Sequence, residues 1–153
     1  MNKLLQFVVS LLLFFSAASF ATIKSIEVIT DKGKVQVPIE TLRSESNDII
    51  VIFAPYRGRK VEMKGIYLED FIARYSSKEP VSVTLTALDD YQVSLNNWPK
   101  KHWLLVTHED GKPLTVRQHG PVRLVESSYE ETEVSNLRSF NDWIWMVTKI
   151  ESN

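Results

Sequence analysis

The sequence predicts an α+β domain built around a mixed, curled β-sheet with few helices. Along most of the chain, short segments alternate between apolar and polar residues, and only one segment spaces its apolar residues three and four apart. Alternation is typical of strands with one buried face, whereas the wider spacing marks one face of a helix. Because no linker, repeat or low-complexity segment interrupts these patterns, we expect a single domain.

The first third of the chain predicts a hairpin, a buried strand and a basic loop. β-branched residues alternate with polar ones on both sides of an Asp-Lys-Gly turn, and a continuous apolar run follows. The expected elements are strands at 25–30 and 34–37, a short helical or irregular piece at 38–42, a buried strand at 48–53 and a loop rich in positive charge at 54–60.

Residues 65–75 predict the one clear helix. Leu68, Phe71, Ile72 and Tyr75 are spaced as successive positions on one face of an amphipathic helix. The proline that follows at position 80 is expected to end this segment.

The rest of the chain predicts further short strands separated by turns. Asp89 and Asp90 favour a turn because aspartate side chains bond to nearby backbone groups. Trp143 and Trp145 would share one face of the last strand and pack in the core. The expected strands lie at 81–87, 91–95, 101–107, 122–125 and 142–151, with a hairpin turn at 109–112 and a weak helix or turn at 135–139.

The N-terminus predicts an export signal. Lys3 provides a short positive region, residues 4–15 are mostly apolar, and Ser19-Phe20-Ala21 is a small-residue cleavage pattern. An apolar run of about 12 residues is shorter than the roughly 20 that a membrane span needs. We therefore expect a signal peptide over residues 1–21, a mature domain over residues 22–153 and a periplasmic location; an uncleaved anchor is the alternative.

Composition excludes several classes of function. The 153 residues carry 18 Lys and Arg against 19 Asp and Glu, with no basic stripe, which argues against nucleic acid as a partner. The chain has no cysteine, so thiol catalysis, thiolate metal sites and disulfides are excluded. It also lacks a nucleophile elbow, a phosphate loop and a His-Glu-x-x-His motif.

Three motifs follow one another in a characteristic order: Ala87-Leu-Asp-Asp-Tyr91, then Asp110-Gly-Lys-Pro-Leu114, then His119-Gly-Pro-Val-Arg123. A Gly-x-x-Leu-x-x-Phe helix precedes them and a Trp-bearing strand follows. This order resembles the sulfite-oxidase-type molybdopterin-binding family over roughly residues 48–150. The resemblance implies the sulfite-oxidase-like fold in compact form.

The chain departs from that family's enzymes at three places. The cysteine that ligates molybdenum would fall near residues 56–60, where there is none. A Pro-Gly segment that wraps the cofactor is replaced by Glu126-Ser127-Ser128, and Ile144 stands where a lysine often precedes the tryptophan. The resemblance therefore implies a secreted relative that binds a simple reduced pterin and no metal. Some such relatives are thought to report pterin levels to the periplasmic domain of a membrane cyclic-di-GMP enzyme.

A pterin ring offers an N–H and an amino group on one edge and a flat face. One ionised carboxylate can accept both donors, and an aromatic ring can cover the face. Glu126, after the Gly-Pro-x-Arg strand, is the predicted edge-reading acid; the alternative is a solvated acid at a strand end. Trp98, in a polar loop, is the predicted stacking residue; the alternative is a hydrophobic plug over the core.

The resemblance also places Arg123 and His119 at the cofactor cleft. Arg123 could contact a ligand oxygen, or it could pair with an acid such as Asp89 and hold the loops together. His119 could donate to a carbonyl but has no second metal ligand nearby in the sequence.

The basic loop supplies the remaining predicted ligand-binding residues. Tyr56, Arg57 and Arg59 would meet the pterin side chain or an acidic partner surface, and an ordinary solvated loop is the alternative.

Three functions are compatible with these features. The working hypothesis is a periplasmic, non-catalytic pterin-binding protein that regulates a membrane cyclic-di-GMP signalling partner. The alternatives are a molybdopterin-dependent oxidoreductase with an atypical metal ligand such as Asp or Ser, and an adaptor that keeps the fold but has lost the pocket.

Overall fold

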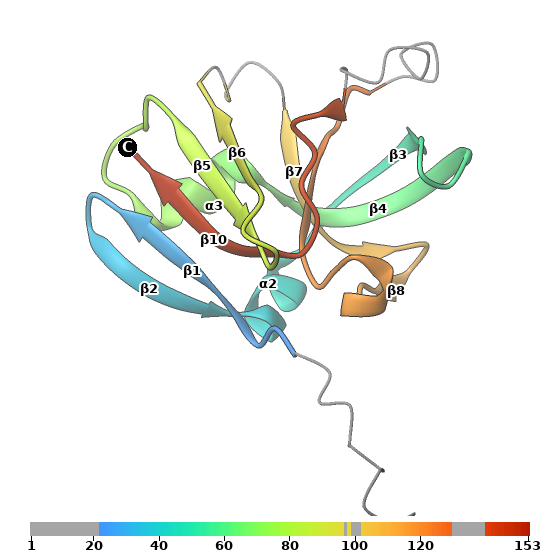
Figure 1. Ribbon diagram of the computed structural model, residues 1–153, viewed down its shortest axis with the longest axis horizontal. Helices are drawn as coiled ribbons and strands as arrows, with labels where there is room; N and C mark the ends of the chain where they lie inside the picture. Colours follow the sequence, from blue (N-terminus) through green and yellow to red (C-terminus); the bar gives the residue numbers. More distant parts are fainter. Residues whose placement is uncertain (1–21, 97, 99–101, 130–139) are drawn as a thin grey trace, which may run out of the picture.

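The computed structural model describes residues 22–96, 98, 102–129 and 140–153 and confirms the α+β class (Figure 1). Its strands are β1 (Ser25–Thr30), β2 (Gly33–Pro38), β3 (Asp48–Ala54), β4 (Arg59–Tyr67), β5 (Val83–Ala87), β6 (Gln92–Leu95), β7 (Trp103–Glu109), β8 (Lys112–Pro113), β9 (Arg123–Glu126) and β10 (Val147–Ser152). Its helices are α2 (Ile39–Glu45) and α3 (Leu68–Tyr75), and η2 (Val116–Gln118) is a 3-10 turn.

The strands form two five-stranded sheets rather than the single sheet expected from the sequence. The first has the order β2-β1-β10-β5-β6, and the second has the order β3-β4-β7-β8 with β9 also paired to β7. β1 pairs antiparallel with β2 and parallel with β10, so the first sheet is mixed and joins the two ends of the domain. Such pairings between distant segments cannot be recognised from local alternation, which fixes each strand but not its neighbours.

The second sheet contains β4, which the sequence reading divided between a loop and the start of a helix. Buried and exposed residues do alternate along β4, with Val61 and Met63 buried and Lys60 and Glu62 exposed. Gly65 lies in this strand at a register shift against β7. A Cβ at Gly65 would lie 2.1 Å from the carbonyl oxygen of Leu105, so the close approach of the two strands requires glycine.

β3 was expected to be fully buried, and this expectation was wrong. Ile49 and Val51 are 58% and 61% exposed, while Ile52 and Ala54 are buried. Burial alternates along β3, an edge strand of its sheet, so only one of its faces is covered. A continuous apolar run does not distinguish a half-exposed edge strand from a buried one.

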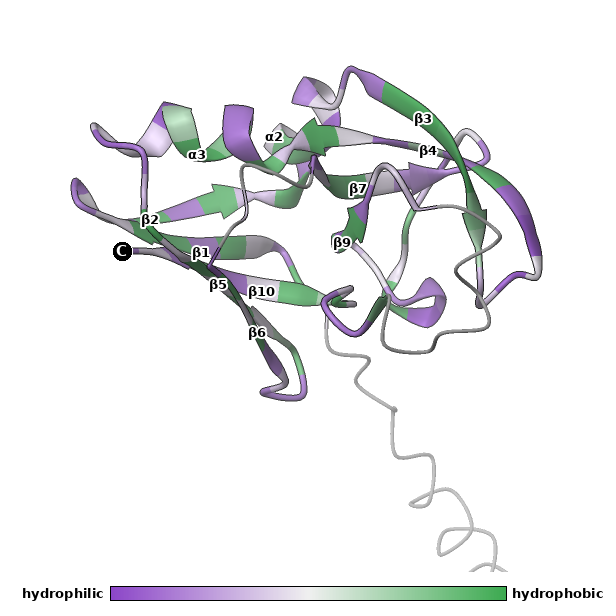
Figure 2. Cartoon of the chain, turned by 90° about the horizontal axis from the view of Figure 1, so that it is seen from above, coloured by the Kyte–Doolittle hydropathy of each residue, from purple (hydrophilic) through white to green (hydrophobic). Residues whose placement is uncertain are grey.

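The predicted amphipathic helix is confirmed as α3, with Leu68, Phe71 and Ile72 buried. α2 and α3 lie along the same side of the molecule, and both contact β4 and β7 (Figure 2). Among the described residues, no helix has the length and apolar character needed to span a bilayer.

The closing strand is shorter than expected, because β10 begins only at Val147. Met146 has a φ of 51°, which breaks the extended backbone, and Ile144 makes a single bridge to Leu124. Trp143 is buried, as expected, whereas Trp145 is half-buried. The predicted helix or turn at 135–139 lies outside the described residues.

The close approach at Gly65 predicts a large stability loss on substitution. Gly65→Ala should lower the free energy of unfolding by about 3 kcal/mol, because the new methyl group meets the Leu105 backbone rather than a flexible side chain. Urea denaturation followed by circular dichroism measures the loss. As a control, Gly58→Ala has open space around its Cβ but a φ of 63°, so it should cost only about 1 kcal/mol. Equal losses would contradict the packing explanation.

Candidate functional site

A fully buried arginine forms the centre of the candidate site. β9 places Arg123 at 0% exposure, where Nη1 donates to Oε2 of Glu109 at 2.7 Å and also to the Tyr56 hydroxyl. Nη2 donates to the backbone carbonyl of Gln118, just before the Gly-Pro turn. The buried Nε has no hydrogen-bond partner within the described part of the chain. Arg123 thus joins β9 to β7, to the β3–β4 turn and to η2.

Glu109, at the end of β7, is the counter-ion of this arginine. Besides the Arg123 contact, it accepts hydrogen bonds from the Tyr56 hydroxyl at 2.9 Å and from Nε of Arg57 at 2.7 Å. Burial acts to raise the pKa of Glu109, but the Tyr56 hydrogen bond and the charges of Arg123 and Arg57 outweigh it and lower the pKa. Glu109 therefore carries a negative charge at neutral pH. A carboxylate has roughly four acceptor sites and three are used, so one remains for a further donor.

Two aromatic rings enclose the guanidinium group. The charged carbon of Arg123 lies 4.9 Å from the ring centroids of both Tyr56 and Trp145. The two rings meet edge to face with their centroids 4.9 Å apart. Burial raises the pKa of Tyr56 well above its ordinary range, so its hydroxyl stays protonated and can donate to Glu109 while accepting from Arg123. These contacts compensate in part for removing the cation from water.

The turn after η2 brings His119 next to this cluster. His119 caps η2 with a φ of 61°, and its ring centroid lies 6.2 Å from that of Trp145. A Cβ at Gly120 would lie 2.4 Å from the Leu114 side chain, so glycine lets this turn pack closely against the preceding segment. The His119 side chain is exposed.

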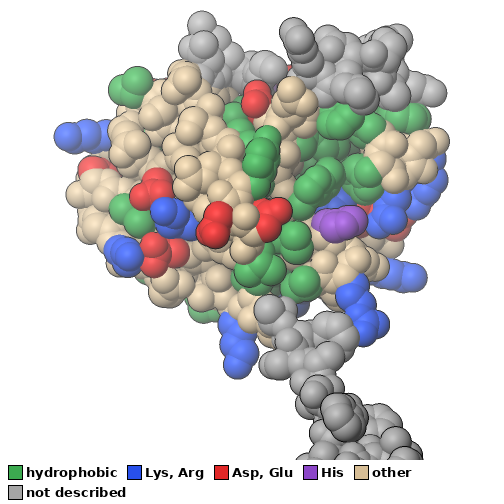
Figure 3. Space-filling model, in the orientation of Figure 1, with side chains coloured by type: hydrophobic (Ala, Val, Ile, Leu, Met, Phe, Trp, Pro, Cys, Tyr) green, Lys and Arg blue, Asp and Glu red, His purple; other side chains and the backbone are tan. Residues whose placement is uncertain are grey.

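A polar hollow of about 430 Å³ opens beside the cluster. Its lining holds three cations and two carboxylates, which gives one positive charge in excess; the lining residues are Arg57, Arg59, Glu109, Asp110, Lys112, Leu114 and Gln118. Arg59 and Asp110 form an exposed ion pair at 2.5 Å. Figure 3 shows Lys and Arg side chains gathered beside a histidine and a group of hydrophobic side chains on one face of the molecule.

The structure thus brings together five of the seven residues predicted to bind ligand. Tyr56, Arg57, Arg123 and His119 belong to the cluster or border it, and Arg59 lines the hollow. Arg123 pairs with Glu109 and not with Asp89, which lies in the turn after β5.

The other two predicted residues lie elsewhere. Glu126 is half-buried at the end of β9, opposite Trp103, where Ser128 donates to it at 3.2 Å. Trp98 is 3% exposed, donates its indole N–H to the Pro80 carbonyl at 3.0 Å, and lines a separate hollow beside α3. The burial of Trp98 agrees with the alternative that it plugs the core.

Sequence reasoning missed Glu109, and it assigned Trp145 to the core. Glu109 was read only as the first residue of a hairpin turn, because it is followed by Asp110-Gly111. One signal was available: Glu109 ends an apolar strand in a chain that also contains a loop with three cations. An acid at such a position is an expected counter-ion.

The residues present fit only part of a molybdopterin cofactor. The thiolate that holds molybdenum in the sulfite-oxidase family has no equivalent, because the chain has no cysteine. The cations around the hollow and the spare acceptor site of Glu109 do fit a polar heterocycle.

Comparison with known proteins supports the fold at a coarse level. No protein-family model matches the chain, and no curated protein sequence matches it significantly. Among solved structures, the chain is similar to the sulfane dehydrogenase SoxCD from Paracoccus pantotrophus, with a TM-score of 0.61 and 14% sequence identity. The match covers 87% of this chain but only 39% of the SoxCD chain. At this identity the similarity concerns the fold alone.

The Arg123–Glu109 pair predicts a charge-dependent stability. Glu109→Gln should lower the free energy of unfolding by about 3 kcal/mol, because it leaves a buried guanidinium without its full counter-charge. The matched substitution Asp110→Asn removes an exposed partner and should cost about 1 kcal/mol or less. Chemical denaturation at pH 7 measures the free energy of unfolding of both variants. Similar losses in the two variants would contradict a stabilising role for the buried Arg123–Glu109 pair.

The same pair predicts how stability depends on pH. The pKa of Glu109 is lower in the folded state than its ordinary value of 4.5, so its contribution is complete above about pH 4.5 and is lost as pH falls through the lowered folded-state value. The stability difference between wild type and Glu109→Gln should therefore shrink on acidification below pH 4.5. Other acids, such as Asp31 with a pKa lowered to about 2 by Ser77 and Ser76, affect both proteins equally. A difference that stays constant would contradict the assignment.

Proposed function

We propose that this chain is a periplasmic protein that binds a reduced pterin without catalysis and regulates a membrane cyclic-di-GMP signalling partner. The observation that carries the proposal is the buried Arg123–Glu109–Tyr56 cluster beside a polar hollow, in a fold similar to that of the sulfane dehydrogenase SoxCD but in a chain without cysteine. The N-terminal signal pattern supports the periplasmic location.

The chemistry of the site suits a neutral heterocycle with donors and acceptors on its rim. Arg57 and Lys112 can donate to the carbonyl oxygen of a pterin, and Glu109 retains one acceptor site for an N–H. Trp145 and Tyr56 are half-buried beside the cluster and outside the lining of the hollow, so a flat ligand would meet a ring only where it extends beyond the hollow. Glu126 is the second candidate for the acid that reads the pterin edge, since it ends the strand that carries Arg123.

The resemblance, rather than the site, supports the signalling partner. Exposed Arg59, Asp110 and Lys112 at the rim of the hollow would let a partner sense whether the hollow is occupied. A pull-down of the periplasmic domain of a neighbouring membrane signalling protein, with and without pterin, tests this part separately.

Binding of 6-methyl-tetrahydropterin, measured anaerobically by calorimetry, tests the proposed ligand. Wild type should bind one equivalent, and Trp145→Leu should weaken binding at least tenfold by removing an aromatic face. Lys112→Met should weaken it about threefold. Lys60→Met removes an equivalent exposed charge on β4, away from the described hollows, and should leave the affinity unchanged.

The substitution Glu126→Gln tests which of the two acids, Glu126 or Glu109, binds the edge of the pterin. A loss of tenfold or more would assign edge reading to Glu126, whereas unchanged affinity would assign it to Glu109. No binding by wild type, or full affinity in both Trp145→Leu and Lys112→Met, would contradict the proposed site.

A further inference from the structure

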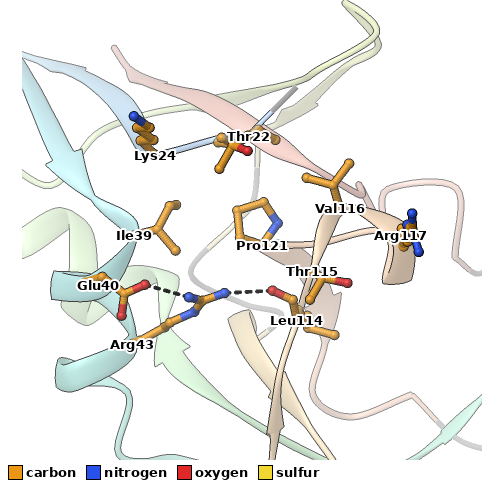
Figure 4. A pocket seen from close by; sticks show the side chains of 11 residues that line it. Thr22, Lys24, Ile39, Glu40, Arg43, Leu114, Thr115, Val116, Arg117 and Pro121 are labelled. Carbon is orange, nitrogen blue, oxygen red and sulfur yellow. Dashed lines mark hydrogen bonds and ion pairs between the residues drawn. The ribbon is translucent and has the colours of Figure 1, made fainter. Parts of the chain in front are cut away.

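Another hollow, of about 670 Å³, lies where β1 begins, between α2 and the segment before β9 (Figure 4). Its volume falls in the range typical of sites for small molecules. Three separate segments line it, with Thr22, Ile23, Lys24, Ile39, Glu40, Arg43, Leu114, Thr115, Val116, Arg117 and Pro121. Only Leu114 is shared with the polar hollow.

The walls of this hollow are mostly apolar. In the view of Figure 4, Pro121 lies between Ile39 on one side and Val116 on the other. Ile23 and Val116 are half-buried rather than part of the closed core, so they remain available to a ligand. Covering such surface releases water and favours an apolar ligand body.

A guanidinium group crosses one side of the hollow. Arg43 extends from α2 to donate Nη2 to the Leu114 carbonyl at 2.8 Å, while its Nη1 pairs with Glu40 at 2.6 Å (Figure 4). Its Nε is buried and has no hydrogen-bond partner among the described residues. The contacts with Glu40 and Leu114 hold the guanidinium, and its positive charge, at the side of the hollow.

The charges of the lining favour an anion. Lys24, Arg43 and Arg117 are cationic, and Glu40 is the one acid among the lining residues. The excess of two positive charges lies around an apolar interior, which matches a molecule with an apolar body and a negatively charged end.

We propose that this hollow binds a small organic anion with an apolar body, with the body against Ile39, Val116 and Pro121 and the charged group facing Arg43 and Lys24. The site is separate from the proposed pterin site and does not depend on that proposal. Its occupant is a small molecule, because the hollow has the volume of one and combines an apolar interior with an excess of positive charge.

The probe 1-anilinonaphthalene-8-sulfonate tests the proposal, since it is an aromatic body with one sulfonate. The chain, expressed with its native N-terminus and purified in folded form, should bind one equivalent with enhanced fluorescence. The uncharged analogue N-phenyl-1-naphthylamine should bind at least fivefold more weakly. Equal or tighter binding of the uncharged analogue would overturn the assignment of an anion.

Variants locate the probe. Lys24→Glu, at an exposed position, should weaken sulfonate binding at least fivefold, and Val116→Asp should weaken it at least tenfold. Lys60→Glu makes the same charge reversal outside the lining and should stay within twofold of wild type. Thermal melting verifies that each variant is folded. Affinity that is unchanged in both Lys24→Glu and Val116→Asp would overturn the proposed site, as would displacement of the probe by a peptide of residues 1–21.

Discussion

The burial of one positive charge, on Arg123, is the constraint on which the candidate site depends. A guanidinium removed from water costs several kcal/mol unless counter-charge and acceptors surround it, and here Glu109, the Tyr56 hydroxyl and the Gln118 carbonyl do so. These partners come from β7, the β3–β4 turn and η2, so a single side chain holds three separate segments in register. The polar hollow borders the same partners, and its shape is therefore tied to this ion pair.

The local spacing of apolar residues was sufficient to predict those strands and helices that bury one of their faces. The β1–β2 hairpin and α3 appear where alternation and helical spacing placed them. β4 was missed because its outward residues are charged and Gly65 interrupts the pattern at a strand crossing, where glycine is needed for contact with β7. The division into two sheets depends on the parallel pairing of β1 with β10, which joins residues more than 100 positions apart and leaves no local trace in the sequence.

The candidate site was predicted only in part, because sequence motifs identify single residues but not the distant residues that they contact. Tyr56, Arg57 and Arg123 came from motifs, and the structure brings them into one cluster. Glu109 was missed because its partner Arg123 is brought to it by the pairing of β7 with β9, and its only local signal is an acid at the end of an apolar strand. Trp98 lies on a polar stretch of chain, yet it is buried with its N–H satisfied by Pro80, which shows that loop position alone does not indicate exposure.

The chain shares its fold at a coarse level with the sulfane dehydrogenase SoxCD but has no cysteine, so the proposed pterin site would hold its ligand without a thiolate-bound metal. The most direct measurement is mass spectrometry and elemental analysis of whatever small molecule co-purifies with the natively exported protein. The account predicts an unphosphorylated reduced pterin, near one equivalent, without molybdenum. Molybdenum together with a phosphorylated pterin, or a ligand that is not a pterin, would contradict it.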